Sequence, residues 1–456
     1  MQYRTTSRGD VAELLSIAFP LVVSQGCETL MMFTGRLFLS RLGSEYMAAA
    51  MGGGLTCFML TTFFVGLTGY TNALVAQYYG SGQPERCGLA AGQALIISLA
   101  AYPLLLAAIP IGTALFHAVG VPENQLGPQT TYFTIAMLGT VISLARGTLG
   151  SFFSGIGRTR IVMVSAATCL VVNVGAAYVL IFGKLGLPAL GIAGAGIGML
   201  VAGASGLLVL IAAYLLQENR LDYGTVAGLR WHWPTMTKLL RLGAPSGAEL
   251  FLNLLAFNLL VLVFHSRGPE VAAAVTVAFN WDMMSFIPLI GINIGVASLV
   301  GRNMGARRPD LAHRVTMSGI KLVCVYISII ILTYSLLPTV LAGLFLSPAD
   351  GEAWRLAVFM VRLVSVYVFA DALGLVFSGA LRGAGDTFAT MCLSVSTHWV
   401  LLLTTVFNLR VLQASPRAAW IVLVILIWTI GGAFYLRYRT GHWRTLRVVG
   451  DTPGAE

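Results

Sequence analysis

The sequence predicts an all-α polytopic membrane protein with about twelve transmembrane helices in two six-helix lobes, related by a parallel pseudo-two-fold repeat. Of its 456 residues, 57% are hydrophobic and only 10% are charged, whereas soluble proteins usually carry about a quarter charged residues. Apolar runs recur along the chain, and each is close to the roughly 20 residues that cross a bilayer. The two halves also share residues at a constant spacing. This composition argues strongly against a multi-domain cytosolic enzyme.

The first six spans make up the N-terminal lobe, residues 1–216. The polar residues 1–10 lead directly into the first span, so we expect no cleavable signal peptide. Gly194, Gly196 and Gly198 lie inside the sixth span and are typical of close helix packing in membranes. By apolar length, the six spans run near residues 14–35, 46–74, 89–116, 129–153, 161–182 and 189–216.

The longest polar stretch, residues 217–237, is predicted to be a cytoplasmic linker between the lobes. The C-terminal lobe follows as residues 238–440, and residues 441–456 form a cytoplasmic tail. The six cysteines are scattered without a C-x-x-C pair, which favours buried thiols over disulfides or a metal site. The second six spans run near residues 238–264, 271–300, 315–343, 354–380, 388–410 and 417–436.

An internal repeat relates the two lobes. Residues match at an offset of 225 over some 65 residues without a gap, and further on the offset becomes 228. Six spans per copy is an even number, so both copies enter the membrane from the same side. Transporters built from such parallel repeats place their substrate site between them. The matching pairs include Pro20 with Pro245, Gly43 with Gly268, Glu45 with Glu270, Gly66 with Gly291 and Gly80 with Gly305.

The basic residues predict the orientation in the membrane. With the N-terminus inside, 18 of the 28 Lys and Arg residues fall in cytoplasmic segments, 7 in outer loops and 3 within spans, as the positive-inside rule requires. We therefore expect a multi-pass protein of the cell (inner) membrane with both termini cytoplasmic. The net charge of +10 is mostly a topology signal, with an added attraction to anionic lipid.

Common enzyme motifs are absent from the sequence. It contains no G-x-x-x-x-G-K-[ST] phosphate loop, no H-E-x-x-H, no G-x-S-x-G and no paired His cluster. We therefore expect no enzyme activity and no cofactor. Ionisable residues at membrane depth remain as candidates for a functional site. Inserting each of them into the membrane costs roughly 3 kcal/mol, so we expect each to have a structural or functional role.

Asp371 is the clearest of these candidates. It lies mid-span, and Tyr367 precedes it by one helical turn on the same face. A carboxylate and a phenol so placed can bind a proton or a sodium ion in the interior of a lobe. The alternative is a structural ion pair between Asp371 and an intramembrane arginine such as Arg362 or Arg146.

Glu249 is the second candidate. It follows Pro245 by four residues, with Asn253 a further turn along on the same face. Pro245 removes a backbone donor and can bend the helix, which leaves nearby polar groups available to a ligand. Alternatively, Glu249 is near enough to the helix end to snorkel toward water.

Four further polar residues lie at membrane depth. Glu28 in the first span and Asp282 in the eighth are candidates for an additional intramembrane polar site, together with Arg146. Arg146 can also simply neutralise one of the acids. His398 stands alone in an apolar run, where a histidine is more often a hydrogen-bonded packing residue.

Three stretches resemble the multidrug and toxic compound extrusion family of secondary transporters, and the resemblance covers nearly the whole chain. The most specific is residues 173–198, NVGAAYVLIFGKLGLPALGIAGAGIG, which resembles the family's fifth and sixth helices and the loop joining them. The second is SGALRGAGDT at residues 378–387. The third is VAQYYG from Val75 with its repeat VGRNMG from Val300.

The resemblance implies two lobes with a central cleft that rock between inward-open and outward-open states. It also implies export of amphipathic, often cationic organic compounds against inward flow of Na⁺ or H⁺. The partners we expect are such small molecules and membrane lipid, with no nucleic acid, and we expect a monomer.

The resemblance also suggests where the coupling ion binds. Family members with a cation site in the C-terminal lobe use a Tyr and an Asp one turn apart on the tenth helix, which Tyr367 and Asp371 match. They also use a Glu eight residues after the proline of the seventh helix. Here that position is Asn253, with Glu249 one turn earlier as a substitute. We therefore expect Asp371, assisted by Glu249, to bind the coupling ion, Na⁺ or H⁺.

The N-terminal lobe departs from the family pattern. Family members with a proton site there carry an Asp in the first helix and another four residues after the Asn of the fifth. Those positions are Gly35 and Ala177 in this sequence. The usual proton mechanism of that lobe is therefore not supported, although Glu28 is a candidate replacement.

Two alternatives stay open. The chain could be a flippase of the same superfamily that moves a lipid-linked oligosaccharide, but such proteins usually line the cleft with several Arg or Lys residues, and only Arg146, Lys321 and Arg362 lie within spans here. A membrane-embedded enzyme would need clustered His or Asp motifs near one interface, and the sequence shows none.

Overall fold

The computed structural model describes residues 9–450, and within that range the regular elements are all helices. Contacts divide this part of the chain into two compact units. The C-terminal unit comprises residues 9–18 and 249–448, and the N-terminal unit comprises residues 19–248 with 449–450. The boundaries fall inside α1 (Val11–Ser40) and α11 (Trp233–His265). Each of these helices therefore contributes to both units, whereas the predicted boundary between lobes lay in the linker.

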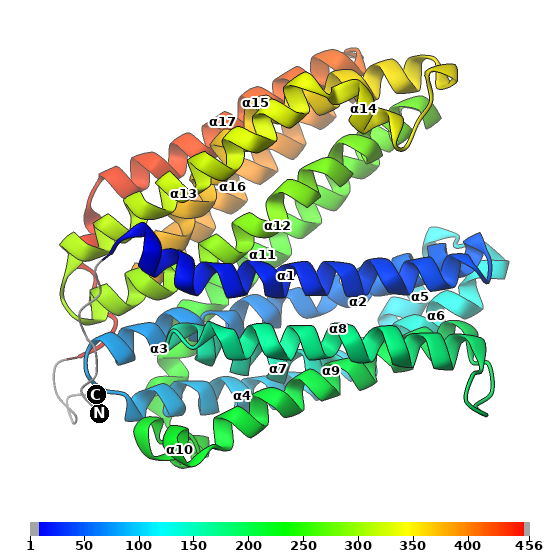
Figure 1. The fold of residues 1–456 in the computed structure, drawn as a ribbon. Helices are drawn as coiled ribbons and strands as arrows, with labels where there is room; N and C mark the ends of the chain where they lie inside the picture. Colours follow the sequence, from blue (N-terminus) through cyan, green and yellow to red (C-terminus); the bar gives the residue numbers. More distant parts are fainter. Residues whose placement is uncertain (1–8, 451–456) are drawn as a thin grey trace. The chain divides into compact units, whose positions relative to one another are not determined.

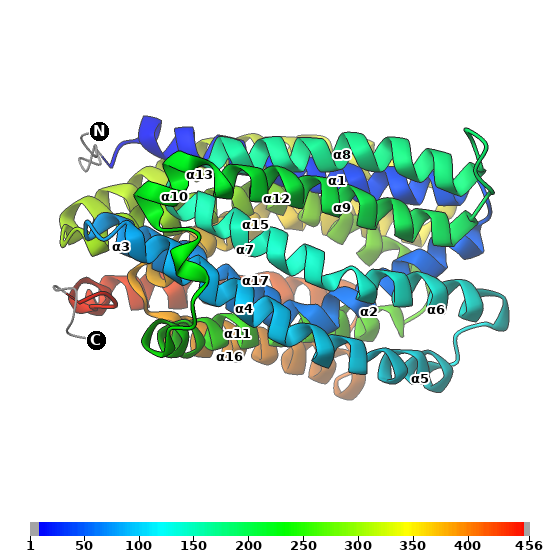
Figure 2. The ribbon, with the colours of Figure 1, turned by 90° about the horizontal axis from the view of Figure 1, so that it is seen from below.

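The N-terminal unit packs its helices around small and aromatic side chains. Helices α8 and α9 lie side by side, as both views show (Figures 1 and 2), and α7 packs on α3 and α4. Phe133 and Met137 are completely buried in one of its apolar clusters. Besides its part of α1 and α11, the unit contains α2 (Ser44–Gly69), α3 (Thr71–Gly80), α4 (Glu85–Ala107), α5 (Ile109–Val119), α6 (Glu123–Leu138), α7 (Thr140–Gly155), α8 (Thr159–Phe182), α9 (Gly191–Leu215), α10 (Gln217–Tyr223) and the 3₁₀ turn η1 (Ala227–Leu229).

The C-terminal unit is organised around α15, against which α12, α13 and α17 all pack (Figure 1). A Cβ atom at Gly383 of α15 would lie 2.5 Å from the Ala297 carbonyl oxygen of α12, so the two backbones touch because that position carries no side chain. The helices are α12 (Pro269–Gly305), α13 (Pro309–Leu336), α14 (Pro338–Gly343), α15 (Glu352–Ala384), α16 (Thr387–Val406) and α17 (Pro416–Arg439), with short turns η2 (Pro348–Asp350), η3 (Phe407–Val411) and η4 (His442–Thr445).

The expected number of membrane spans is confirmed for the described residues. Eleven helices are long and apolar enough to cross a membrane, and the bent pair α6–α7 brings the number to twelve. That pair, predicted as one span over 129–153, bends by 45° at a break of one residue, Gly139. The predicted third span, 89–116, is likewise divided between α4 and the short α5.

Candidate functional site

Three of the predicted polar residues lie together in the C-terminal unit. Asp371 and Tyr367 project from α15, and Asp282 projects from α12. Asp282 is close enough to act electrostatically on Asp371 and faces the Tyr367 hydroxyl, although that hydroxyl makes no hydrogen bond of good geometry. Tyr367 is 2% exposed, and both carboxyl groups are partly exposed. We call these three residues the Asp371 cluster.

Helix α13 and a local hydrogen bond fix the backbone that carries Asp282. The Tyr334 hydroxyl of α13 donates to the Trp281 carbonyl at 2.7 Å, and the Tyr326 hydroxyl donates to the Ser285 carbonyl at 3.0 Å. Ser285 in turn donates its hydroxyl to the Asp282 carbonyl at 2.7 Å. The second acid of the cluster therefore comes from a helix segment held in place by its neighbours.

Neither arginine considered as a partner neutralises Asp371. Arg146 pairs with Glu28 instead, and Arg362 is exposed. Across residues 9–450, Asp371 forms no ion pair with a basic side chain. Two acids that share a partly exposed site without a counter-charge attract a proton or a small cation.

Glu249 does not join this cluster, which corrects the expectation that it assists Asp371. The Arg382 guanidinium donates to the Glu249 carboxylate at 2.6 Å. Arg382 follows Asp371 by eleven residues on α15, or about 16 Å along the helix axis. Glu249 is also only 2% exposed, so it does not snorkel toward water. Asp282, rather than Glu249, supplies the second carboxyl group beside Asp371.

Asn253 joins α11 to α16, and His398 makes its hydrogen bond within α16. The Asn253 amide donates to the Ser394 hydroxyl at 2.8 Å, and the His398 ring nitrogen Nδ1 lies 2.7 Å from the Ser394 carbonyl oxygen. His398 is thus a hydrogen-bonded packing residue, as the sequence suggested. Asn253 is part of the same polar contact and not of the Asp371 cluster.

The N-terminal unit places its two candidate residues in one ion pair. Arg146 of α7 donates to the Glu28 carboxylate of α1 at 2.5 Å, and both side chains are partly exposed. The side-chain amide oxygen Oδ1 of Asn173 on α8 is buried without a hydrogen-bond partner among residues 9–450. Nothing lies within 4 Å of a Cβ built on Gly35, and Ala177 is buried among apolar residues. The acid in this unit is therefore neutralised, unlike Asp371.

Sequence reasoning missed Arg382 as the partner of Glu249 and did not join Asp282 to Asp371. The available signal for Arg382 was its spacing, because eleven residues are three helical turns and place it on the Asp371 face of α15. The grouping of Asp282 with Asp371 depends on how α12 packs on α15. The pattern of residues along each helix does not predict which residues of two packed helices meet.

Comparison with known protein families decides the identity. Residues 20–179 and 245–408 each match the MatE family model. The chain belongs to the MATE family of transporters. The two matched segments begin at Pro20 and Pro245, so they follow the repeat at an offset of 225 residues. The predicted family and the two-copy architecture are thereby confirmed.

Relatives within the MATE family match along most of their length. The multidrug resistance protein PmpM of Pseudomonas aeruginosa is 26% identical over 427 residues, covering 92% of this chain and 89% of PmpM. The probable multidrug resistance protein NorM of Bradyrhizobium diazoefficiens is 26% identical over 437 residues, covering 94% and 93%.

Solved MATE structures share the fold. A multidrug resistance MATE family transporter of the MOP superfamily, in an outward-facing conformation, superposes with a TM-score of 0.87 at 20% identity, covering 97% of this chain and 100% of that one. The eukaryotic MATE transporter AtDTX14 gives a TM-score of 0.83 at 18% identity, covering 95% and 96%. At these identities the likeness concerns the fold alone.

Proposed function

We propose that this protein is an antiporter that exports amphipathic, often cationic organic compounds by alternating access, in exchange for Na⁺ or H⁺. Membership of the MATE family supports transport, and the names of PmpM and NorM as multidrug resistance proteins support organic compounds as substrates. The proposed location is the cell membrane with both termini cytoplasmic, which the distribution of basic residues supports.

The coupling ion binds at the Asp371 cluster in this proposal. The observation that carries it is a pair of carboxyl groups, Asp371 and Asp282, placed beside the Tyr367 hydroxyl without an ion pair to any basic residue in the range 9–450. Sodium prefers oxygen ligands, and a shared proton relieves repulsion between adjacent carboxylates. Either ion therefore fits the chemistry of the cluster.

Coupling follows from a difference in ion affinity between two conformations. An ion shifts the equilibrium between inward-open and outward-open states only by as much as its affinities for those states differ. Binding of Na⁺ or H⁺ from outside at Asp371 favours the state that releases substrate outward. A cationic substrate from the cytoplasm then competes with the ion for the negative charge and resets the cycle.

The test is ethidium efflux from proteoliposomes containing the purified full-length chain, with a Na⁺ gradient and a pH gradient imposed separately. Asp371→Asn keeps the size of the side chain but removes the charge, and we expect it to abolish efflux driven by either gradient. Asp282→Asn should weaken efflux at least about tenfold, because one acid of the pair remains. The gradient that drives efflux by the unmodified protein identifies the ion.

Asp310→Asn is the matched control. Asp310 lies in the first turn of α13 and is exposed, so its loss should leave efflux unchanged. Full gradient-driven efflux by Asp371→Asn, with normal yield and melting temperature, would contradict the proposed ion site. Failure of all forms to move organic cations, combined with movement of a lipid-linked oligosaccharide, would instead favour the flippase alternative.

A further inference from the structure

The segment that joins the two halves is folded and fixed to α4. Thr225 donates its hydroxyl to the Tyr214 carbonyl at 3.0 Å, and the Tyr214 hydroxyl donates to the Thr225 carbonyl at 3.2 Å. On α4, Gln93 donates to the Arg230 carbonyl at 2.7 Å and accepts from the His232 amide at 3.1 Å. Figure 2 shows this green segment crossing α4. The predicted linker thus forms part of the N-terminal unit.

Close backbone contact makes this attachment rigid. A Cβ atom at Gly228 would lie 2.4 Å from the carbonyl group of Gly88 on α4, so only glycine permits this approach. Asn219 of α10 accepts from the Arg158 guanidinium at 2.8 Å and donates to the Ala213 carbonyl at 2.6 Å. The chain on both sides of η1 is therefore held in one conformation.

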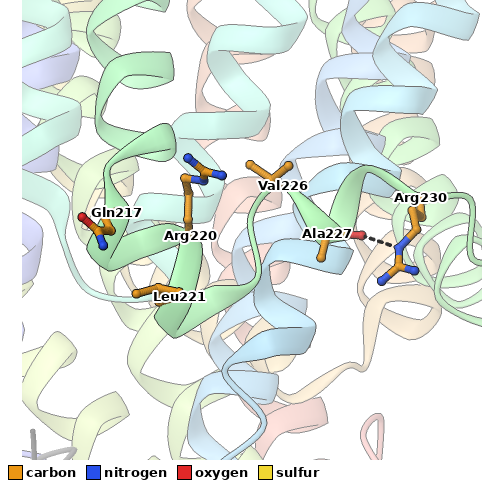
Figure 3. Close-up of a pocket in the computed structure, with 6 residues that line it drawn as sticks. All are labelled: Gln217, Arg220, Leu221, Val226, Ala227 and Arg230. Atoms are coloured by element: carbon orange, nitrogen blue, oxygen red, sulfur yellow. Dashed lines mark hydrogen bonds between the residues drawn. The ribbon is translucent and has the colours of Figure 1, made fainter.

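A cavity of about 610 Å³ opens on this fixed segment, between α10 and η1. Figure 3 shows Arg220 at the α10 end and Arg230 at the opposite end, with Val226 and Ala227 between them. The Arg230 Nε donates to the Ala227 carbonyl at 3.3 Å. The two terminal nitrogens of the Arg230 guanidinium take no part in that hydrogen bond. Within residues 9–450 neither arginine forms an ion pair, and both are exposed.

Helix α10 keeps its acidic side chains away from the cavity. Gln217, Arg220 and Leu221 share one helical face because they are spaced three and four residues apart. Glu218 and Asp222, spaced four apart, point roughly 120° away from that face. Of the residues that the structure describes, the cavity is therefore lined by two guanidinium groups, the Gln217 amide and apolar side chains, without a carboxylate.

The cavity also lies next to the end of a membrane span. Helix α9 ends at Leu215, and α10 begins at Gln217. Leu221 in the cavity wall is 75% exposed. The adjoining Trp231 and Trp233 stack with their ring centroids 5.9 Å apart, and these residues are 61% and 62% exposed. Tryptophan is enriched where the lipid headgroups meet water.

We propose that this cavity binds the phosphate headgroup of an anionic membrane phospholipid, through Arg220 and Arg230. Guanidinium groups pair with phosphate oxygens through two parallel hydrogen bonds, and basic clusters beside a span attract anionic lipids. Leu221 and Val226 contact the glycerol and the first acyl carbons. Stacked Trp231 and Trp233 keep the segment at headgroup level.

The apolar wall favours a lipid over a soluble phosphate compound. A free phosphate would use the two arginines but would leave Leu221 exposed to water, which costs about 25 cal/mol for each Å² of apolar surface. A lipid covers that surface and is already concentrated at this depth. The site does not depend on the proposed antiport, because it uses no residue of the Asp371 cluster.

The test uses the purified full-length protein in detergent, titrated with dioctanoyl phosphatidylglycerol while its melting temperature is recorded. Dioctanoyl phosphatidylcholine and inorganic phosphate are the comparison probes. We expect phosphatidylglycerol to raise the melting temperature more than either. In R220Q/R230Q its apparent affinity should fall about 30-fold, because each basic residue near an anionic surface is worth about a factor of five.

Two further variants make the result specific. Arg308→Gln removes an exposed charge from the α12–α13 loop and should leave the response unchanged. Leu221→Gln should weaken the phosphatidylglycerol response and leave the phosphate response as it was. Unchanged affinity in R220Q/R230Q, an equal loss in R308Q, or equal responses to phosphatidylglycerol and phosphatidylcholine would each overturn the proposal. A full effect from inorganic phosphate would overturn it in favour of a soluble ligand.

Discussion

Glu249 and Arg382 form an ion pair in which the acid is almost completely buried. The Glu249 side chain is 3% exposed and the Arg382 side chain 33%, and the paired oxygen and nitrogen atoms are 2.6 Å apart. Within the part of the chain that the structure describes, one oxygen of Glu249 and the Nε of Arg382 have no hydrogen-bond partner, so the hydrogen bonding of the pair is incomplete. In such pairs, removal of one member leaves a buried charge without compensation.

We predict that Glu249→Gln and Arg382→Gln each lower the free energy of unfolding by about 2–3 kcal/mol. Because Arg382 is partly exposed, the loss should lie at the low end for buried pairs. The double variant should recover much of the loss, because neither charge remains unpaired. Melting temperatures in detergent measure the effect, with an expected fall of about 5 °C for each single variant.

The exposed pair Glu352–Arg417 provides the control for this prediction. Its atoms are also 2.6 Å apart, but both side chains are nearly half exposed. Glu352→Gln should therefore cost no more than about 1 kcal/mol. The prediction would be contradicted if the double variant, Glu249→Gln with Arg382→Gln, were no more stable than the less stable of the two single variants.

At the scale of the helices, the sequence predicted the number of spans well and their ends poorly. Apolar residues mark the part of a helix that lies in lipid, but the hydrogen-bonded backbone of the helix continues beyond that part. Helix α12 therefore reaches Gly305 and α15 reaches Ala384, past the predicted ends at 300 and 380. The break between α6 and α7 at Gly139 has no hydropathy signal, because both sides are apolar.

The contact between α12 and α15 provides a second prediction at this scale. Gly383→Ala should destabilise the C-terminal unit by about 1–3 kcal/mol, because a methyl group would overlap the Ala297 carbonyl oxygen. Gly432→Ala is the matched control, since nothing lies within 4 Å of a Cβ on that glycine of α17. Alanine favours helix there, so its melting temperature should stay equal or rise. Equal melting temperatures for both variants would contradict the close approach.

For the whole molecule, the repeat was the most informative feature of the sequence. A constant offset of 225 residues from Pro20 indicates two copies by itself, and the family matches at 20–179 and 245–408 agree with it. The candidate site was only partly predictable. Asp371 and Tyr367 are neighbours along one helix, whereas Asp282 and Arg382 reach their partners only through packing between helices.

The even number of membrane spans predicts on which side of the membrane each end of the chain lies. Twelve spans return the chain to its starting side, and 18 of 28 basic residues lie on the side that we propose is cytoplasmic. Alkaline phosphatase fused after Arg439 should be inactive, because it stays in the cytoplasm, whereas green fluorescent protein at that point should fluoresce. Phosphatase fused in the α11–α12 loop, after Arg267, should be active, because the seven spans before that point are an odd number and place it outside. The reverse pattern of activities would invert the orientation, and with it the direction in which the Asp371 cluster takes up its ion.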